Sequence, residues 1–286
     1  MIIYKLIHFF GFVTSYFDFK FFYNLNKIIA FFIHKKKNEK LKLNSDTYFS
    51  FLLKDPYYNR LIYPKFKYEP EVEYILRKLK KINFLFIDAG ANYGYWSVLV
   101  SSKEFNKKKV IALEPLKSNF TFLKKNQTYN KNRFKILNIG VGERKKKTKI
   151  FYNNKTSNVG ASILNDGKKK YSETIKIDKI DNILSKRREK KFVIKLDVEG
   201  NEINTLIGSK KILKKNCLIV YEDHGNDNLH LNTKYLWKKK YSIYYSDGKN
   251  ISKIDKLNEL NDIKRIKHKG YNFIATKSSL FKKKLI

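Results

Sequence analysis

The sequence is organised by one segment, Phe84-Leu85-Phe86-Ile87-Asp88-Ala89-Gly90-Ala91-Asn92-Tyr93-Gly94. It reads as a buried strand that ends in an acid, a turn with two glycines four residues apart, and a helix that begins at Tyr95. Glycines let a backbone approach a ligand closely, and a helix N-terminus presents unpaired N–H groups to a carboxylate or phosphate. The segment therefore predicts a nucleotide-like ligand at the carboxyl end of a parallel strand. A tight strand-to-helix turn without a ligand is the simpler alternative.

Strands and helices alternate from this segment to the C-terminus. The predicted strands are 84–88, 110–114, 134–139, 192–197, 218–222, 242–245 and 272–276; the predicted helices are 95–103, 116–129, 178–185, 202–213 and 233–239. The strands are apolar without strict alternation, and the β-α-β order is typical of a parallel sheet covered by helices on both faces. Residues 147–152 and 174–177 predict an inserted hairpin or edge pair between the third and fourth core strands.

The N-terminal part of the chain has a different composition. Residues 1–40 are aromatic and apolar with interspersed charges, and they include the basic run Lys35–Lys37. Charged residues interrupt every window long enough for a membrane-spanning helix, so amphipathic helices are expected. They either lie on the cytoplasmic face of a membrane, where acidic lipids attract lysines, or pack on the main domain. Residues 41–81 are predicted to form an irregular aromatic cap or lid and a lead-in helix. Residues 82–286 are predicted to form the main α/β domain, and the protein is expected to be cytoplasmic.

Composition narrows the function classes. Forty-two per cent apolar residues, with 22 Phe and 20 Tyr, support a packed core, and a single cysteine excludes a disulfide framework. The net charge of +36 would normally indicate a polyanionic partner. However, only seven of the 62 basic residues are Arg, and the Lys triplets are spread between apolar runs. This pattern favours solvated loops, and an AT-rich coding preference, over a specific nucleic-acid surface.

Glu114 ends the next strand, twenty residues beyond Gly94, where it could accept hydrogen bonds from two ribose hydroxyls. The dinucleotide fingerprint G-x-G-x-x-G needs a glycine where this chain has Asn92, so a ligand without pyrophosphate fits better. S-adenosylmethionine meets this requirement, with its adenine placed against the segment that starts at Asn138. The predicted cofactor-binding residues are Asp88, Gly90, Asn92, Gly94, Glu114 and Asn138.

A second charged group ends the fourth core strand. In an extended strand the side chains of Lys195, Asp197 and Glu199 project to one face, so they would line the rim of the sheet where ligands bind. Burying three charges costs several kcal/mol, as an order-of-magnitude estimate, unless they are paired. A catalytic role is therefore predicted for all three, with a structural ion pair between Lys195 and one of the acids as the alternative.

The fifth strand ends in Glu222-Asp223-His224. His224 is predicted to be the general base that removes a proton from a substrate hydroxyl, and Glu222 to orient this base or to bind substrate. A surface histidine beside acids is the alternative. Asp197, Glu222 and His224 could also hold a metal by ligand type, but nothing in their spacing requires one, so no metal is predicted.

Residues from about Glu69 to Thr276, some 200 of 286, resemble the FkbM family of S-adenosylmethionine-dependent methyltransferases. The motifs that carry the resemblance are Ile87–Gly94, Leu113-Glu114-Pro115, Asn158–Ser162, Ile177–Ile180, Tyr221–His224 and, most specifically, the K-x-D-x-E-G-x-E pattern of Lys195–Glu202. The resemblance implies a Rossmann-like class I methyltransferase fold with a mostly parallel seven-stranded sheet. The segment Gly140–Glu143 matches the family loosely, and residues 1–65 lie outside the resemblance.

The resemblance also implies an O-methyltransferase that acts on a hydroxyl of a sugar, glycan or related small molecule, with S-adenosylmethionine as cofactor. Two alternatives from other classes remain at this stage. A nicotinamide-dependent oxidoreductase is disfavoured by Asn92 and by the missing third glycine. A basic nucleic-acid-binding protein would show a steep salt dependence of binding. The sequence names neither the methyl acceptor nor the oligomeric state.

Overall fold

The computed structural model describes residues 38–55, 57–63, 66–153, 160–164, 167–223, 227–265 and 271–285. The helical extension is predicted over residues 1–40, and its first 37 residues lie outside the described part of the chain. His224 also lies outside it. Within the described ranges, no helix is long and apolar enough to cross a membrane.

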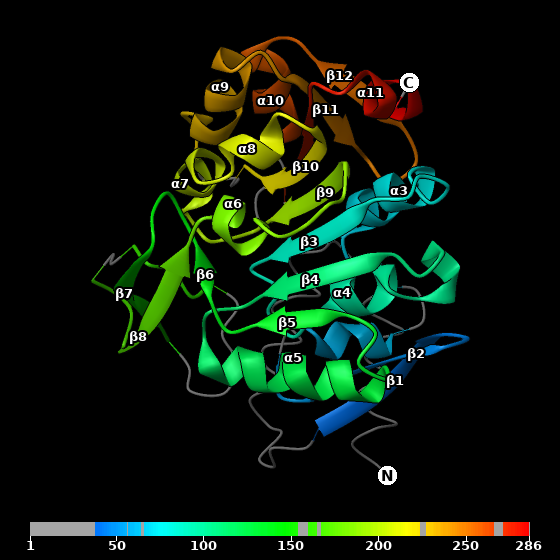
Figure 1. The fold of residues 1–286 in the computed structure, drawn as a ribbon, viewed down its shortest axis with the longest axis vertical. Coiled ribbons are helices and arrows are strands. Elements are labelled where there is room, and N and C mark those ends of the chain that lie inside the picture. Colours follow the sequence, from blue (N-terminus) through cyan, green and yellow to red (C-terminus); the bar gives the residue numbers. More distant parts are fainter. Residues whose placement is uncertain are drawn as a thin grey trace.

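A twisted eight-stranded sheet forms the centre of the molecule, in the order β12-β11-β13-β10-β9-β3-β4-β5 (Figure 1). Strands β5, β4, β3, β9 and β10 run parallel, whereas β13 is antiparallel to β10 and β11, and β12 is antiparallel to β11. Their bounds are β3 (Leu85–Ala89), β4 (Lys109–Leu113), β5 (Lys135–Leu137), β9 (Lys191–Leu196), β10 (Asn216–Glu222), β11 (Ser242–Ser246), β12 (Ile251–Ile254) and β13 (Asn272–Thr276).

The seven predicted strands are all present, and the mostly parallel α/β fold is confirmed. The prediction missed only β12 in this sheet, which makes eight strands rather than seven. Its sequence, Ile-Ser-Lys-Ile, is half polar, and its central residues are exposed. Such a short edge strand is fixed by pairing with β11 rather than by its own pattern.

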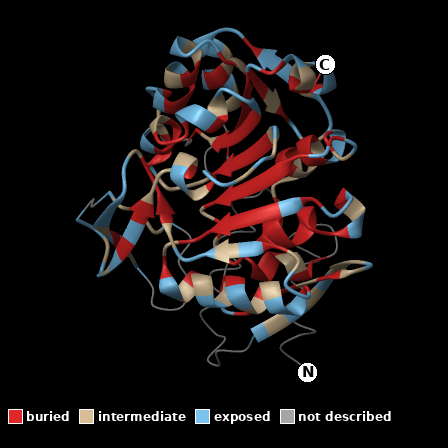
Figure 2. Ribbon diagram, in the orientation of Figure 1, coloured by how far each residue is buried: buried red, intermediate tan, exposed pale blue. Residues whose placement is uncertain are grey.

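Helices cover both faces of the sheet and bury two apolar clusters. One cluster packs α3 (Pro70–Lys78), α4 (Tyr95–Val100), α5 (Lys117–Tyr129) and α11 (Ser279–Leu285) against the sheet. The other packs α6 (Ile180–Ile183), α7 (Glu202–Ile207), α8 (Lys210–Leu213), α9 (Leu231–Lys238) and α10 (Leu257–Ile263). Figure 2 shows the central strands as a buried band between helices whose outer sides are exposed.

The five predicted helices occur, four of them with shorter or divided bounds, whereas α9 begins two residues earlier than predicted; the sequence did not predict α10 and α11. The helix expected at 95–103 ends at Val100 and is followed by the 3-10 turn η2 (Lys103–Phe105). The helix expected at 202–213 is divided into α7 and α8 at Gly208 and Ser209. A Cβ on Gly208 would lie 2.0 Å from the carbonyl oxygen of Gly142, so close backbone packing accounts for this break.

Residues 38–52 form a hairpin of β1 (Asn38–Asn44) and β2 (Thr47–Leu52), where the sequence analysis expected irregular chain from position 41. The hairpin packs on α5, where Asn126 bridges to it. Its Oδ1 accepts the N–H of Ser50 at 2.6 Å, and its Nδ2 donates to the Ser50 carbonyl at 2.9 Å. The lead-in helix is present as α3, and the 3-10 turn η1 (Asn59–Ile62) lies between the hairpin and this helix.

A small sheet of β6 (Gly140–Val141), β8 (Tyr171–Asp178) and β7 (Lys146–Tyr152) stands beside the carboxyl ends of the central strands (Figure 1). Strands β7 and β8 pair antiparallel from Lys146 opposite Ile177 to Tyr152 opposite Tyr171. This confirms the predicted insertion between the third and fourth core strands. The insertion brings apolar side chains of β7 and β8 to the edge where parallel strands bind ligands.

Candidate functional site

A pocket opens at the carboxyl ends of β3, β4 and β9, and it encloses about 910 Å³ of empty space that is continuous with solvent. It lies where Figure 1 shows the arrowheads of β3 and β4 facing the small sheet. Its walls come from the glycine loop after β3, the turn after β4, the loop after β9, the small sheet, and the aromatic segment before α3. Of the predicted site residues, the pocket brings together Asp88, Gly90, Asn92, Glu114, Lys195, Asp197 and Glu199.

The glycine loop is held against the end of β9. Gly90 has a φ of +83°, and a Cβ there would lie 1.7 Å from the backbone oxygen of Asp197. Gly94 has a φ of +85°, and a Cβ there would lie 2.4 Å from Leu123 Cδ1 on α5. Only glycine satisfies both the left-handed backbone and the close approach at these positions. Gly94 lies at the N-cap of α4 and does not itself line the pocket.

Glu114 joins the glycine loop to the turn after β4. One carboxylate oxygen accepts the N–H of Asn92 at 2.8 Å, and the other accepts the N–H of Leu116 at 2.9 Å. The residue is 5% exposed, and burial raises the pKa of its carboxyl to about 7 against the opposing effect of these hydrogen bonds. Glu114 therefore orders the pocket wall and presents a carboxylate to the pocket.

Asp88 and Asn92 offer two further oxygens beside this carboxylate. Asp88 accepts two hydrogen bonds from Ser97 at the start of α4, one from its N–H at 3.1 Å and one from its hydroxyl at 2.6 Å. Burial raises the pKa of Asp88, while Lys195 opposes this shift. The Oδ1 atom of Asn92 is buried and has no hydrogen-bond partner among the described residues. A buried acceptor without a partner fits a site that receives a donor from a ligand.

Asn138, which the sequence analysis placed among the cofactor-binding residues, is exposed and does not line the pocket. Its side-chain amide donates to the carbonyl oxygens of Glu114 and Pro115 at 2.8 and 2.9 Å. It thus fixes the turn that carries Glu114. The next residues in the chain, Ile139 and Gly140, line the pocket instead.

Lys195 and Asp197 form an ion pair of 2.8 Å between Nζ and Oδ2 at the end of β9. The Lys195 side chain is 4% exposed, and that of Asp197 is 25% exposed toward the pocket it lines. Burial alone would lower the pKa of Lys195, but the carboxylates of Asp197, Glu69 and Asp88 raise it well above its usual range. Lys195 therefore keeps its positive charge at neutral pH. This pair is the ion pair that the sequence analysis considered as the alternative to catalysis.

Glu199, Glu222 and His224 have different positions. Glu199 lines the pocket, but its φ of +53° shows that the extended alternation of β9 ends before it. Glu222 ends β10 and does not line the pocket; its carbonyl accepts a hydrogen bond from Asn232 at 3.0 Å. Asp223 is fully buried and pairs with Lys264 at 2.7 Å. His224 lies outside the described residues, so its role stays a prediction.

One part of the pocket wall, named the aromatic half, consists of aromatic side chains for which the sequence predicted no site role. Tyr57, Tyr58 and Tyr68 come from the segment before α3, and Tyr95 and Trp96 from α4. The Tyr68 and Tyr95 rings lie 4.4 Å apart, and the side chains of Tyr57 and Tyr68 share a hydrogen bond. The aromatic content of residues 41–70 was the available signal, but nothing local showed which rings face a ligand.

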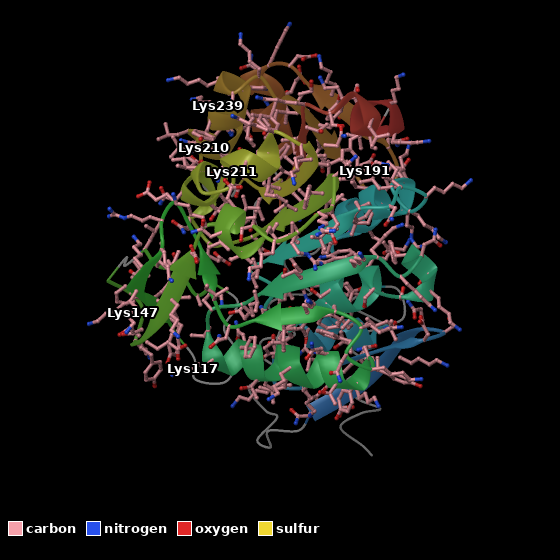
Figure 3. The ribbon with its side chains drawn as sticks, viewed as in Figure 1. Lys117, Lys147, Lys191, Lys210, Lys211 and Lys239 are labelled. Atoms are coloured by element: carbon pink, nitrogen blue, oxygen red, sulfur yellow. The ribbon has the colours of Figure 1, made fainter. Side chains whose placement is uncertain are left out.

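The remaining candidate features are clusters of metal-ligating side chains and the lysines of the surface. No group of three or more His, Cys, Asp or Glu side chains able to hold a metal ion occurs in the described part of the chain. Figure 3 shows labelled lysines that extend outward from separate elements, among them Lys117 on α5, Lys147 on β7 and Lys210 on α8. These three lysines are exposed, and they lie on helices and a strand rather than in the loops that the sequence favoured.

Comparisons with known proteins agree with the fold and the motifs. A family model described as the methyltransferase FkbM domain matches residues 88–243. No curated protein matches the chain.

Solved structures similar to this chain include a methyltransferase FkbM from Methylobacillus flagellatus, with 17% identity and a TM-score of 0.43. That match covers 68% of this chain but only 43% of that protein. A second is a SAM-dependent O-methyltransferase from Thermotoga maritima, with 14% identity and a TM-score of 0.38 over 75% of this chain and 65% of that one. A third is TYW2 from M. jannaschii in complex with AdoMet, with 14% identity and a TM-score of 0.40 over 84% and 85% of the two chains.

Proposed function

Because the chain belongs to the FkbM methyltransferase family, we propose that it transfers a methyl group to a hydroxyl oxygen of a sugar, a glycan or a related small metabolite. The enzyme is an S-adenosylmethionine-dependent methyltransferase. The family assignment leaves the nicotinamide-dependent oxidoreductase and the non-enzymatic nucleic-acid-binding protein without support.

One observation carries the proposal for the acceptor. The pocket lining combines the glycine loop and Glu114, the cofactor half, with Tyr57, Tyr68, Trp96 and the Lys195–Asp197 pair, the aromatic half. Aromatic rings beside fixed polar groups suit an acceptor that has an apolar face and several hydroxyls, as a sugar ring has. The small-molecule or glycan acceptor would occupy this aromatic half.

In the cofactor half, Glu114 would accept hydrogen bonds from ribose hydroxyls, and Asn92 Oδ1 would accept one from a ligand donor. Gly90 allows the glycine loop to lie against the end of β9. Gly94 is the N-cap of α4, and Asp88 binds the start of this helix through Ser97. Asn138 supports the turn that carries Glu114. These oxygens and the glycine cradle fit a cofactor that bears a ribose, without the third glycine that pyrophosphate requires.

When bound, S-adenosylmethionine would supply an electrophilic methyl group for the acceptor oxygen and would leave as the uncharged thioether. The protein lowers the barrier mainly by aligning the acceptor hydroxyl with that methyl group. Asp197, which is paired with Lys195, would lie near the sulfonium end of the cofactor together with Asp88. Lys195 and Glu199 would position acceptor hydroxyls or the base at the end of β9. His224 is our proposed base for the hydroxyl proton, with Glu222 as its proposed orienting partner, and base catalysis contributes about 10²–10⁴-fold.

The test combines binding and transfer. Calorimetry should detect S-adenosylmethionine binding and no binding of NAD, and methyl transfer should be screened over nucleotide sugars and glycans. Glu114→Ala should weaken S-adenosylmethionine binding about tenfold or more, because hydrogen bonds to a charged group each contribute about 1.5–3 kcal/mol. His224→Ala should leave binding intact and lower turnover by about 10²–10⁴-fold.

Glu143→Ala is the matched control, since Glu143 is 41% exposed and lies outside the pocket lining. Unchanged affinity in Glu114→Ala would remove Glu114 from the ribose role. A wild-type protein that binds the cofactor but methylates no hydroxyl acceptor would contradict the proposed acceptor class.

A further inference from the structure

Glu69 is an acidic residue of the pocket region that lies outside the family match, which begins at residue 88. It precedes α3 with a φ of +42°, a left-handed conformation that is uncommon for a residue other than glycine. Its carbonyl accepts the N–H groups of Val72 and Glu73, so the unusual backbone is fixed by the start of the helix. The carboxylate points away from solvent, with 13% of the side chain exposed.

The carboxylate of Glu69 contacts two residues that line the pocket. It accepts a hydrogen bond from Trp96 Nε1 at 2.5 Å and lies 3.7 Å from Lys195 Nζ. Lys195 is paired in turn with Asp197 at 2.8 Å. One ammonium thus lies between two carboxylates, of which Asp197 lines the pocket and Glu69 does not.

A third carboxylate belongs to the same cluster. Lys195 is the register partner of Asp88 on the neighbouring strand β3, so their side chains share one face of the sheet. Glu71 also acts on Glu69, and its carboxylate accepts a hydrogen bond from Asn272. The phenol groups of Tyr57, Tyr58, Tyr68 and Tyr95 face Glu69 as well.

The described cluster therefore holds more carboxylates than ammonium groups. Burial raises the pKa of Glu69 to about 7; Asp197 and Glu71 act in the same direction, whereas Lys195 and the Trp96 hydrogen bond oppose it. Glu69 can thus be neutral or charged near neutral pH. Lys195 Nζ lies 2.8 Å from Asp197 and 3.7 Å from Glu69, so an ionised Glu69 would compete with Asp197 for the ammonium.

We propose that Glu69 is a positioning residue of the transfer site, which draws the Lys195 ammonium toward itself and thereby leaves the Asp197 carboxylate free to interact with the cationic cofactor. The inference rests on the proposed function, because it assumes that the sulfonium group of the cofactor lies near Asp197. It makes the segment before α3 a part of the active site rather than only a cap over it.

The first test needs no acceptor. Binding of S-adenosylmethionine and of its uncharged thioether product, S-adenosylhomocysteine, is measured by calorimetry at pH 6, 7 and 8. In the wild type the ratio of the two affinities should increase about threefold or more in favour of S-adenosylmethionine as pH rises, because ionised Glu69 exposes the negative charge of Asp197. In Glu69→Gln the ratio should not change with pH.

Two further variants keep the result interpretable. Glu69→Asp keeps a carboxylate at this position and should retain the pH dependence. That result would also show that the loss of pH dependence in Glu69→Gln is not caused by a change in folding. Glu73→Gln makes the same substitution on α3 at a residue that pairs with Arg77 away from the pocket, and it should behave as the wild type. A ratio that does not change with pH in the wild type, or that changes equally in Glu69→Gln, overturns the inference.

Turnover separates this inference from the proposed function. If the wild type methylates hydroxyl acceptors, Glu69→Gln should lower kcat more than it changes the KM for S-adenosylmethionine. The rise in kcat between pH 6 and 8 should become smaller, because only the part due to the proposed base His224 remains. If no hydroxyl acceptor is methylated while the binding ratio behaves as described, the acceptor class fails and the role of Glu69 stands. If transfer occurs and Glu69→Gln matches Glu73→Gln in both assays, only the Glu69 inference fails.

Discussion

Gly90 shows how one residue controls the site at the smallest scale. Its left-handed φ alone could be adopted by another residue at a modest energetic cost, about 1 kcal/mol. The more severe restriction is spatial, because the position of a Cβ is already occupied by the Asp197 carbonyl at 1.7 Å. The glycine loop and the loop after β9 are therefore in direct backbone contact, so a change in one displaces the other.

We predict that Gly90→Ala lowers S-adenosylmethionine affinity at least tenfold and destabilises the protein by about 2 kcal/mol or more, because the loop must move away from β9. Gly167→Ala is the control. Gly167 also has a positive φ, of +72°, but a Cβ there meets no atom within 4 Å. Calorimetry and urea unfolding measure the two effects. Equal losses in both variants would mean that backbone conformation, rather than contact with Asp197, explains the glycine.

At the scale of elements, the hairpin of β1 and β2 depends on a partner distant in sequence. Asn126 on α5 is fully buried and bonds to both polar backbone groups of Ser50, and also to the carbonyl oxygen of Tyr93 at 2.8 Å. One side chain thereby connects the hairpin to the glycine loop. Phe49 on β2 contacts Tyr58 and Tyr95 of the aromatic half, so the hairpin also supports this part of the pocket wall.

We predict that Asn126→Ala destabilises the protein by about 2–4 kcal/mol, because it leaves buried backbone groups without partners. Hydrogen exchange at Ser50 should accelerate as the hairpin separates from α5. Thr128→Ala is the control, since it truncates an exposed polar side chain of the same helix that bonds only to the carbonyl of Lys124. A loss of stability without faster exchange in β2 would contradict the role of Asn126 in docking the hairpin.

At the scale of the whole molecule, the positive charge lies mostly on surface lysines, whereas a few buried acids affect how stability depends on pH. The labelled lysines in Figure 3 lie on several elements, whereas the carboxylates of Glu69 and Glu114 are largely buried. Glu69 and Glu114 each have a pKa raised by burial from about 4.5 to about 7. At pH values between about 4.5 and about 7, the folded state binds more protons than the unfolded state. The contribution of these two carboxyl groups to the free energy of unfolding therefore falls as pH rises.

We predict that replacing Glu114 with Gln changes the pH dependence of unfolding. The melting temperature of Glu114→Gln minus that of the wild type should become more positive between pH 5 and pH 8, because only the wild type must ionise a buried carboxyl. A change of at least about 2 °C is expected, which corresponds to roughly 1 kcal/mol for a chain of this size. Glu143→Gln, at an exposed position, should show a constant difference. A constant difference for Glu114→Gln as well would contradict the raised pKa.

Local spacing in the sequence determined much of the site. The glycine spacing after Asp88, the acid at Glu114 and the pattern around Lys195 and Asp197 identified residues that the structure brings together in one pocket. The sequence could identify them because a charged residue or a glycine turn at the end of an apolar strand is visible within a few consecutive positions. The alternation of apolar strands and helices likewise predicted seven strands of the central sheet.

Only the tertiary structure decided which distant groups meet. Glu69 contacts Lys195, and Asn126 holds Ser50, across separations that no local pattern encodes. The edge strand β12 and the aromatic half of the pocket are likewise fixed by pairing and packing with other segments. The physical reason is common to all of them: burial and hydrogen bonding between remote segments, rather than local propensity, stabilise these contacts, and they exist only once the sheet has assembled.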